Sequence, residues 1–144
     1  MTKQVIFNNQ TETEDFAKAL ALKLKPGNVI RLLGPLGSGK SVIARTIIKA
    51  LGTKEKHIPS PTYTLVQAYD DTTTPIAHMD LYRLDDADEI FDLDIEYYLE
   101  NGILLVEWPQ IADIHLPKNC ITIEFEPSTE DSDIRKATVS GIEI

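Results

Sequence analysis

The stretch GPLGSGKS at residues 34–41 matches the pattern G-x-x-x-x-G-K-[ST], which is typical of a loop that binds phosphate groups. An apolar run of strand length at 28–33 precedes it, and an amphipathic run at 42–51 follows it. Gly52, directly after the second run, is a helix-ending signal. A strand, a glycine-rich loop and a helix in this order predict an α/β protein that binds a nucleotide.

Each fixed position of this loop has a chemical reason. Gly34 and Gly39 permit backbone angles that let successive amides turn toward one anion. Lys40 is expected to be catalytic, because it would hold the β- and γ-phosphates, and the Ser41 hydroxyl is expected to bind Mg²⁺. The remaining nucleotide contacts expected from the loop are Pro35, Leu36, Gly37, Ser38 and Val42.

Two carboxylates follow predicted buried strands. Asp80 ends the run after Pro75, and Glu107 follows the run at 103–106. Because carboxyl ends of parallel strands face the crevice where α/β folds bind ligands, we expect both to act as Mg²⁺ ligands or to position the attacking water. Their spacing leaves open which does which, and ordinary solvated acids are the alternative. Thr62, in the segment SPTYT at 60–64, is either the hydroxyl that reaches the γ-phosphate or a turn residue before a strand.

The aromatic and histidine side chains near these acids indicate a function less clearly than the acids do. Trp108 is either an aromatic platform for the nucleotide or a packed aromatic at the end of a strand. His78 and Tyr82 alternate with Asp80, so they could share its face of the strand. The histidines lack metal-ligand spacing, so no histidine metal site is expected.

The rest of the pattern predicts one domain over 1–144. We expect a strand at 4–7, a capping box at 11–14 and a helix to about residue 25. The runs 63–69 and 76–81 predict an antiparallel hairpin, 85–101 one or two short helices, and the runs 120–126 and 134–144 a second hairpin containing Cys120. The predicted fold class is a three-layer α/β sheet like that of P-loop NTPases, with parallel core strands and antiparallel β-hairpin additions.

The composition argues against several classes of protein. The chain has 144 residues, of which 42% are hydrophobic, and no apolar run approaches the ~20 residues of a membrane span. No signal peptide is expected, because the apolar patch near residue 5 is short, and the single cysteine favours a reducing cytoplasm. The net charge is −9: residues 1–72 hold ten Lys/Arg and six Asp/Glu, whereas residues 73–144 hold four and seventeen. Direct binding of tRNA by this chain alone is therefore not expected.

Four blocks in register resemble the TsaE (YjeE) family of small bacterial P-loop ATPases, which take part in the threonylcarbamoyladenosine modification of tRNA. The blocks are GPLGSGKS at 34–41, SPTYTLV at 60–66, HMDLYRL at 78–84 and LVEWP at 105–109. Their order and spacing match over nearly the whole chain.

The resemblance implies ATP/ADP and Mg²⁺ as ligands, ATP hydrolysis, and docking onto a TsaD–TsaB heterodimer. Lys40 and Ser41 fall on the phosphate lysine and the metal hydroxyl, and Glu107 falls on the metal-linked glutamate. Asp80, Thr62 and Trp108 match positions important for activity, and Thr13 matches a threonine near the base. The family loop usually reads GDLGAGKT, so Pro35 removes a carboxylate and an amide donor here.

Two other functions fit the loop. The first is a small-molecule P-loop kinase, although the four arginines, Arg31, Arg45, Arg83 and Arg135, are few for a basic lid and an acceptor clamp. The second is a nucleotide-gated binding module with negligible turnover. The segment 85–100 holds eight acids and no base, which predicts either solvated helix faces or a partner surface.

Overall fold

A single seven-stranded sheet organises the fold, in the order β1-β7-β6-β2-β5-β4-β3. The computed structural model describes residues 2–35, 37–61, 65–127 and 133–143. The strands are β1 (Thr2–Phe7), β2 (Val29–Leu33), β3 (Val66–Tyr69), β4 (Ile76–Asp80), β5 (Ile103–Glu107), β6 (Ile121–Phe125) and β7 (Arg135–Ser140). The helices are α1 (Gln10–Ala21), α2 (Lys40–Ala50) and α3 (Ile95–Asn101), with 3₁₀ segments η1 (Ala87–Leu93) and η2 (Pro109–His115).

The centre of the sheet is parallel and its two sides are antiparallel. β2 runs parallel to β5 and β6, and β4 runs parallel to β5. β3 pairs with β4, β6 with β7, and β1 with β7, all antiparallel. The predicted fold class is confirmed, including both hairpins, although residues 62–64 of the first predicted strand lie outside the described residues.

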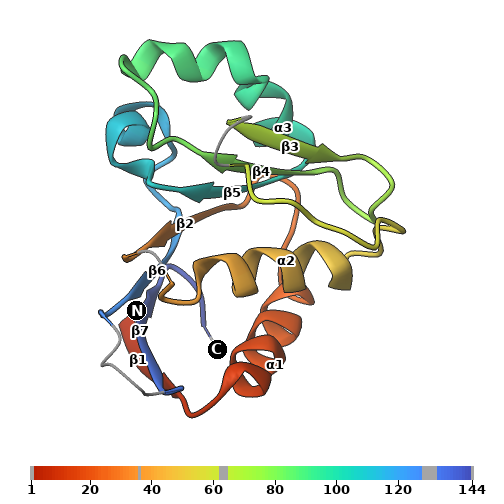
Figure 1. The fold of residues 1–144 in the computed structure, drawn as a ribbon. Coiled ribbons are helices and arrows are strands. Elements are labelled where there is room, and N and C mark those ends of the chain that lie inside the picture. Colours follow the sequence, from red (N-terminus) through yellow and green to blue (C-terminus); the bar gives the residue numbers. More distant parts are fainter. Residues whose placement is uncertain (1, 36, 62–64, 128–132, 144) are drawn as a thin grey trace.

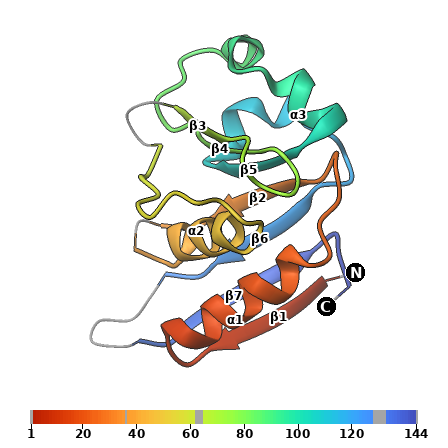
Figure 2. The same cartoon turned by 90° about the vertical axis from the view of Figure 1, so that its right-hand side faces the viewer.

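Helical segments cover both faces of the sheet, which makes three layers (Figures 1 and 2). The sequence of strand β5 is apolar from Ile103 to Val106 because its side chains alternate between two covered faces of the sheet. Ile103 and Leu105 pack in the cluster that contains α1 and α2, whereas Leu104 and Val106 pack in the cluster that contains η1, α3 and η2. The apolar run thus marks a strand buried on both sides.

The predicted capping box at the start of the first helix is wrong by two residues. Asn9 caps α1 by accepting a hydrogen bond from the backbone N–H of Glu12, while the Glu12 carboxylate accepts one from the N–H of Asn8. Thr11 lies within the helix and is exposed. The helix ends at Ala21, earlier than predicted, and the N–H groups of Lys23 and Leu24 then form turn hydrogen bonds. Asparagine is as strong a cap as threonine or stronger, so the local pattern was ambiguous.

Other boundaries shift slightly. Helix α2 begins at Lys40, two residues before the predicted start, and Cys120 precedes β6 rather than lying in it. In the described part of the chain, no helix combines the length and the apolar character that a membrane crossing requires.

Candidate functional site

The glycine-rich loop joins β2 to α2 and packs against β6. Gly34 and Gly39 have φ angles of 136° and 121°, a region that side chains rarely adopt. A Cβ atom at Gly34 would lie 2.9 Å from the Phe125 Cβ, and one at Gly39 would lie 3.0 Å from the Phe125 ring. Gly34 and Gly39 are therefore required both by their backbone angles and by the lack of space, and Phe125 packs directly against the loop.

Lys40 is buried at the start of α2, with 4% of its surface exposed. Its Nζ donates a hydrogen bond to the Gly34 carbonyl oxygen at 2.6 Å and lies 4.2 Å from the centre of the Trp108 ring. Burial lowers the pKa of Lys40, while the negative charges of Glu107 and Asp80 oppose that shift. The ammonium group is thus held inside the loop beside two carboxylates.

Asp80 and Glu107 are the last residues of two neighbouring parallel strands, β4 and β5, and stand opposite each other in the register. Each is only 5% exposed. Because Met79 and Val106 face the other layer, both acids face the layer that contains α2. The Asp80 Oδ1 accepts a hydrogen bond from the Tyr82 N–H at 3.0 Å. The structure therefore brings together the two acids that the sequence singled out.

A buried histidine contacts one of these acids. The His78 Nε2 and the Glu107 Oε2 are 2.6 Å apart, and His78 is 1% exposed. Among the described residues, the His78 Nδ1 has no hydrogen-bond partner. The alternation of His78 with Asp80 predicted its face of the strand correctly, but no sequence pattern indicated its contact with Glu107.

Trp108 directly follows β5 with a φ angle of 53°, which is unusual for a bulky residue. Its ring packs on Tyr82 with 5.1 Å between ring centres and covers the Lys40 ammonium. Trp108 is therefore a partner of the loop lysine. It does not line the cleft that opens between α1, the loop and β7.

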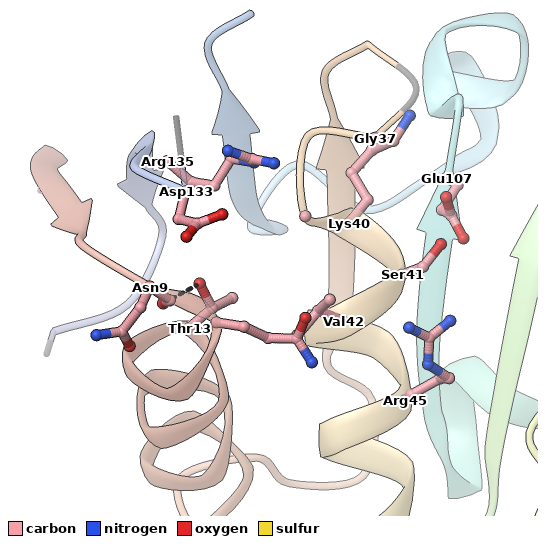
Figure 3. A pocket seen from close by; sticks show the side chains of 12 residues that line it. Asn9, Thr13, Gly37, Lys40, Ser41, Val42, Arg45, Glu107, Asp133 and Arg135 are labelled. Atoms are coloured by element: carbon pink, nitrogen blue, oxygen red, sulfur yellow. Dashed lines mark hydrogen bonds between the residues drawn. The ribbon is translucent and has the colours of Figure 1, made fainter. Parts of the chain in front are cut away.

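A cleft of about 460 Å³ opens between α1, the loop and β7 (Figure 3). The predicted residues that line it are Thr13, Gly37, Gly39, Lys40, Ser41, Val42 and Glu107. Arg45, on the second turn of α2, also lines it. The predicted residues Gly34, Pro35, Ser38, Asp80 and Trp108 do not line it, and Leu36 and Thr62 lie outside the described residues.

The cleft includes residues that sequence reasoning missed. Asn9 and Gln10 come from the start of α1, and Asp133 and Arg135 come from the C-terminal segment. Pairing of β1 with β7 sets Phe7 opposite Arg135, which brings that segment beside Asn9. No local pattern predicts this, because the residues are more than 120 positions apart in the chain.

The donor set fits a nucleotide with a divalent cation better than a cation held by protein alone. The described residues contain no group of three His, Cys, Asp or Glu side chains that could hold a metal ion. Ser41 and Glu107 nevertheless line one cleft, and the Ser41 side chain extends from α2 toward the strand of Glu107 (Figure 3). Mg²⁺ is commonly bound by one or two protein groups together with substrate phosphates.

Comparisons with known proteins identify relatives of this chain. The family model described as threonylcarbamoyl adenosine biosynthesis protein TsaE matches residues 7–137. The chain is 39% identical over 131 residues to a protein of Rickettsia bellii named tRNA threonylcarbamoyladenosine biosynthesis protein TsaE, covering 91% of both. It is 37% identical to the protein of that name from Bacillus subtilis, covering 93% of this chain and 82% of the relative.

A solved structure supports the same relationship. The crystal structure of Bacillus subtilis YdiB matches with a TM-score of 0.74 and 31% sequence identity, over 96% of this chain and 86% of that one. Because the family model spans the loop and both carboxylates, and the relatives match over most of their length, the chain belongs to the TsaE family.

Proposed function

We propose that this protein binds and hydrolyses ATP with Mg²⁺ as an accessory protein in the N6-threonylcarbamoyladenosine modification of tRNA at adenosine 37. The observation that carries the proposal is the position of the loop with Lys40 beside two buried carboxylates at neighbouring strand ends. The biosynthetic role is supported by the family description and by the names of the relatives.

The residues in and beside the cleft have separate roles in this proposal. Lys40 holds the β- and γ-phosphates, together with the amides at the start of α2, which have no partner inside the helix. Ser41 and one of the two carboxylates would hold Mg²⁺, which supplies neutralisation of the phosphate charge when it is bound. The second carboxylate would orient the attacking water. Thr13 and Asn9, at the far end of the cleft, lie where a base or ribose could bind.

Docking onto a TsaD–TsaB heterodimer is part of the proposal, because a chain with net charge −9 is unsuited to hold tRNA by itself. In this arrangement the partners handle the tRNA. Slow ATP hydrolysis by the isolated protein then becomes productive in the complex.

The decisive experiment is a reconstituted reaction with TsaD, TsaB, the threonylcarbamoyl donor, ATP and tRNA. Wild-type protein is expected to support multiple turnovers, whereas Lys40→Ala is expected to reduce turnover to the level without this protein. Equal turnover with Lys40→Ala would contradict the proposed mechanism.

A second variant separates hydrolysis from simple gating. Glu107→Gln should still bind ATP and form the complex but lose hydrolysis, and tRNA modification should stop after the first turnover. If Glu107→Gln or a non-hydrolysable ATP analogue sustained multiple turnovers, the protein would be a nucleotide-gated binding module.

A further inference from the structure

The buried contact between His78 and Glu107 has no role in the mechanism above. We propose that His78 is a positioning residue: its Nε2 holds one carboxylate oxygen of Glu107, so that the other is presented to the cation and nucleotide in the cleft. The inference rests on the proposed function, and of the two carboxylates it assigns Glu107 to the metal-bound nucleotide.

The sheet register makes the contact possible. His78 stands opposite Leu105, and Asp80 stands opposite Glu107, so the histidine reaches Glu107 along the diagonal between neighbouring strands. His78 lies within β4, which is buried along its whole length, and its own surface is 1% exposed. The ring therefore has a fixed place from which to hold the carboxylate.

The chemistry of the pair gives the hydrogen bond its direction. When Glu107 is ionised its carboxylate only accepts hydrogen bonds, so the form of His78 that carries a hydrogen on Nε2 donates it to Oε2 over 2.6 Å. The last torsion of a glutamate side chain is broad and would otherwise allow many orientations. Outer partners of this kind commonly fix the carboxylates that bind metal ions.

A purely structural role for His78 fits the contacts less well. Among the described residues, its Nδ1 is buried without a hydrogen-bond partner. An apolar side chain at this position would fill the layer between β4 and α2 without leaving that polar atom unsatisfied. The contact that distinguishes histidine from an apolar residue here is the one with Glu107.

The test compares His78→Met, which removes the donor at similar length, with His78→Gln, whose amide can take the place of Nε2. Titration calorimetry measures ATP affinity with EDTA and with Mg²⁺, and steady-state assays give kcat and KM. For His78→Met we expect the gain in affinity due to Mg²⁺ to fall at least fivefold and kcat at least tenfold, while affinity in EDTA stays within twofold. His78→Gln should recover most of both losses.

His115 provides a matched control. Its Nε2 lies 2.8 Å from the Asp88 Oδ1, so it forms a second histidine–carboxylate contact, away from the cleft. His115→Met should leave both ATP affinities and kcat unchanged. In a Glu107→Gln background, His78→Met should cause no further loss of the Mg²⁺ effect.

The outcomes separate this inference from the function on which it rests. If wild-type protein shows no Mg²⁺-dependent ATP binding, the proposed function fails and the positioning role fails with it. If wild-type shows it, the role is overturned when His78→Met keeps the Mg²⁺ effect, when it loses affinity equally in EDTA, or when the loss persists in the Glu107→Gln background. Should the Met variant not fold, His78→Leu takes its place, with the same expected losses and the same requirement that they vanish in the Glu107→Gln background.

Discussion

Buried polar side chains in this protein gather around one place. Among the described residues other than tyrosines, every buried polar or charged side chain lies in the cleft or next to it: Thr13, Ser38, Lys40, His78, Asp80 and Glu107. Burying such groups costs free energy unless they are paired, so proteins concentrate them where function requires them. Local motifs predicted Lys40, Asp80 and Glu107, because the chemistry of phosphate binding fixes their residue types. Thr13 was expected only from the family resemblance.

Cys120 is the opposite case, a titratable residue outside the cleft. Its Sγ donates a hydrogen bond to the Pro117 carbonyl oxygen, and burial raises the pKa of the thiol, with Arg31 opposing and Asp113 adding to the shift. The thiolate is the reactive form. Alkylation by iodoacetamide at pH 8.5 should therefore be slower in the folded protein than in urea, as followed by mass spectrometry. The single cysteine makes the signal unambiguous.

The same shift has a consequence for stability. Because the pKa of the Cys120 thiol is raised on folding, its contribution to stability is present below the ordinary thiol pKa and is lost as pH rises through the raised value. Cys120→Ala should remove this part of the pH dependence. If Cys120 were alkylated as fast in the folded protein as in urea, the raised pKa of its thiol would be contradicted.

At the scale of elements, the start of α1 is the sharpest difference between sequence and structure. The Asn9 side chain satisfies the N–H of Glu12, while exposed Thr11 caps nothing. Asn9→Ala should therefore lower the free energy of unfolding by about 1 kcal/mol, within the usual range of 0.5–2 kcal/mol. Thr11→Ala should change it by less than about 0.5 kcal/mol. Urea unfolding followed by circular dichroism measures both, and a larger loss from Thr11→Ala would restore the predicted cap.

The elements that sequence patterns predicted are those whose signals are contiguous. Strand β2, the loop and α2 occupy one unbroken stretch, and β5 is apolar up to its last residue because both its faces are covered. The support of the loop by Phe125 and the approach of Arg135 to the cleft depend on strands distant in sequence. Such contacts are set by sheet order, which hydrophobic periodicity does not specify.

At the scale of the whole molecule, two hydrophobic clusters lie on opposite faces of one sheet. We expect them to unfold together, because the central strands belong to both. Ile47→Ala in α2 and Ile90→Ala in η1 remove fully buried side chains, one from each cluster. Each should lower the free energy of unfolding by about 2–5 kcal/mol. Both should keep a single cooperative transition by urea and by calorimetry. Two separate transitions would contradict the single domain predicted from the sequence.

The acidic segment at 85–100 divides, in the structure, into acids with local partners and acids without them. Asp86 and Glu89 form the capping box of η1, and Asp88 pairs with His115. The carboxylates of exposed Asp85, Glu96 and Glu100 accept no hydrogen bond from the described residues. A docking role should therefore be tested on these three, because neutralising Asp86, Asp88 or Glu89 would also remove contacts of η1.

If these acids contact a basic surface on TsaD–TsaB, their combined neutralisation to Asn or Gln should weaken docking. Exposed ion pairs contribute roughly 0.2–1 kcal/mol each, so the loss of all three should weaken binding by about threefold to about a hundredfold at low salt. The difference should shrink as salt rises, because exposed charges are screened. ATP affinity should not change.

Neutralising Asp15, Glu124 and Glu143 makes the same change in net charge elsewhere and should leave docking intact. Equal docking by both triple variants at every salt concentration would mean that the acids of 85–100 face solvent and do not contact the partner.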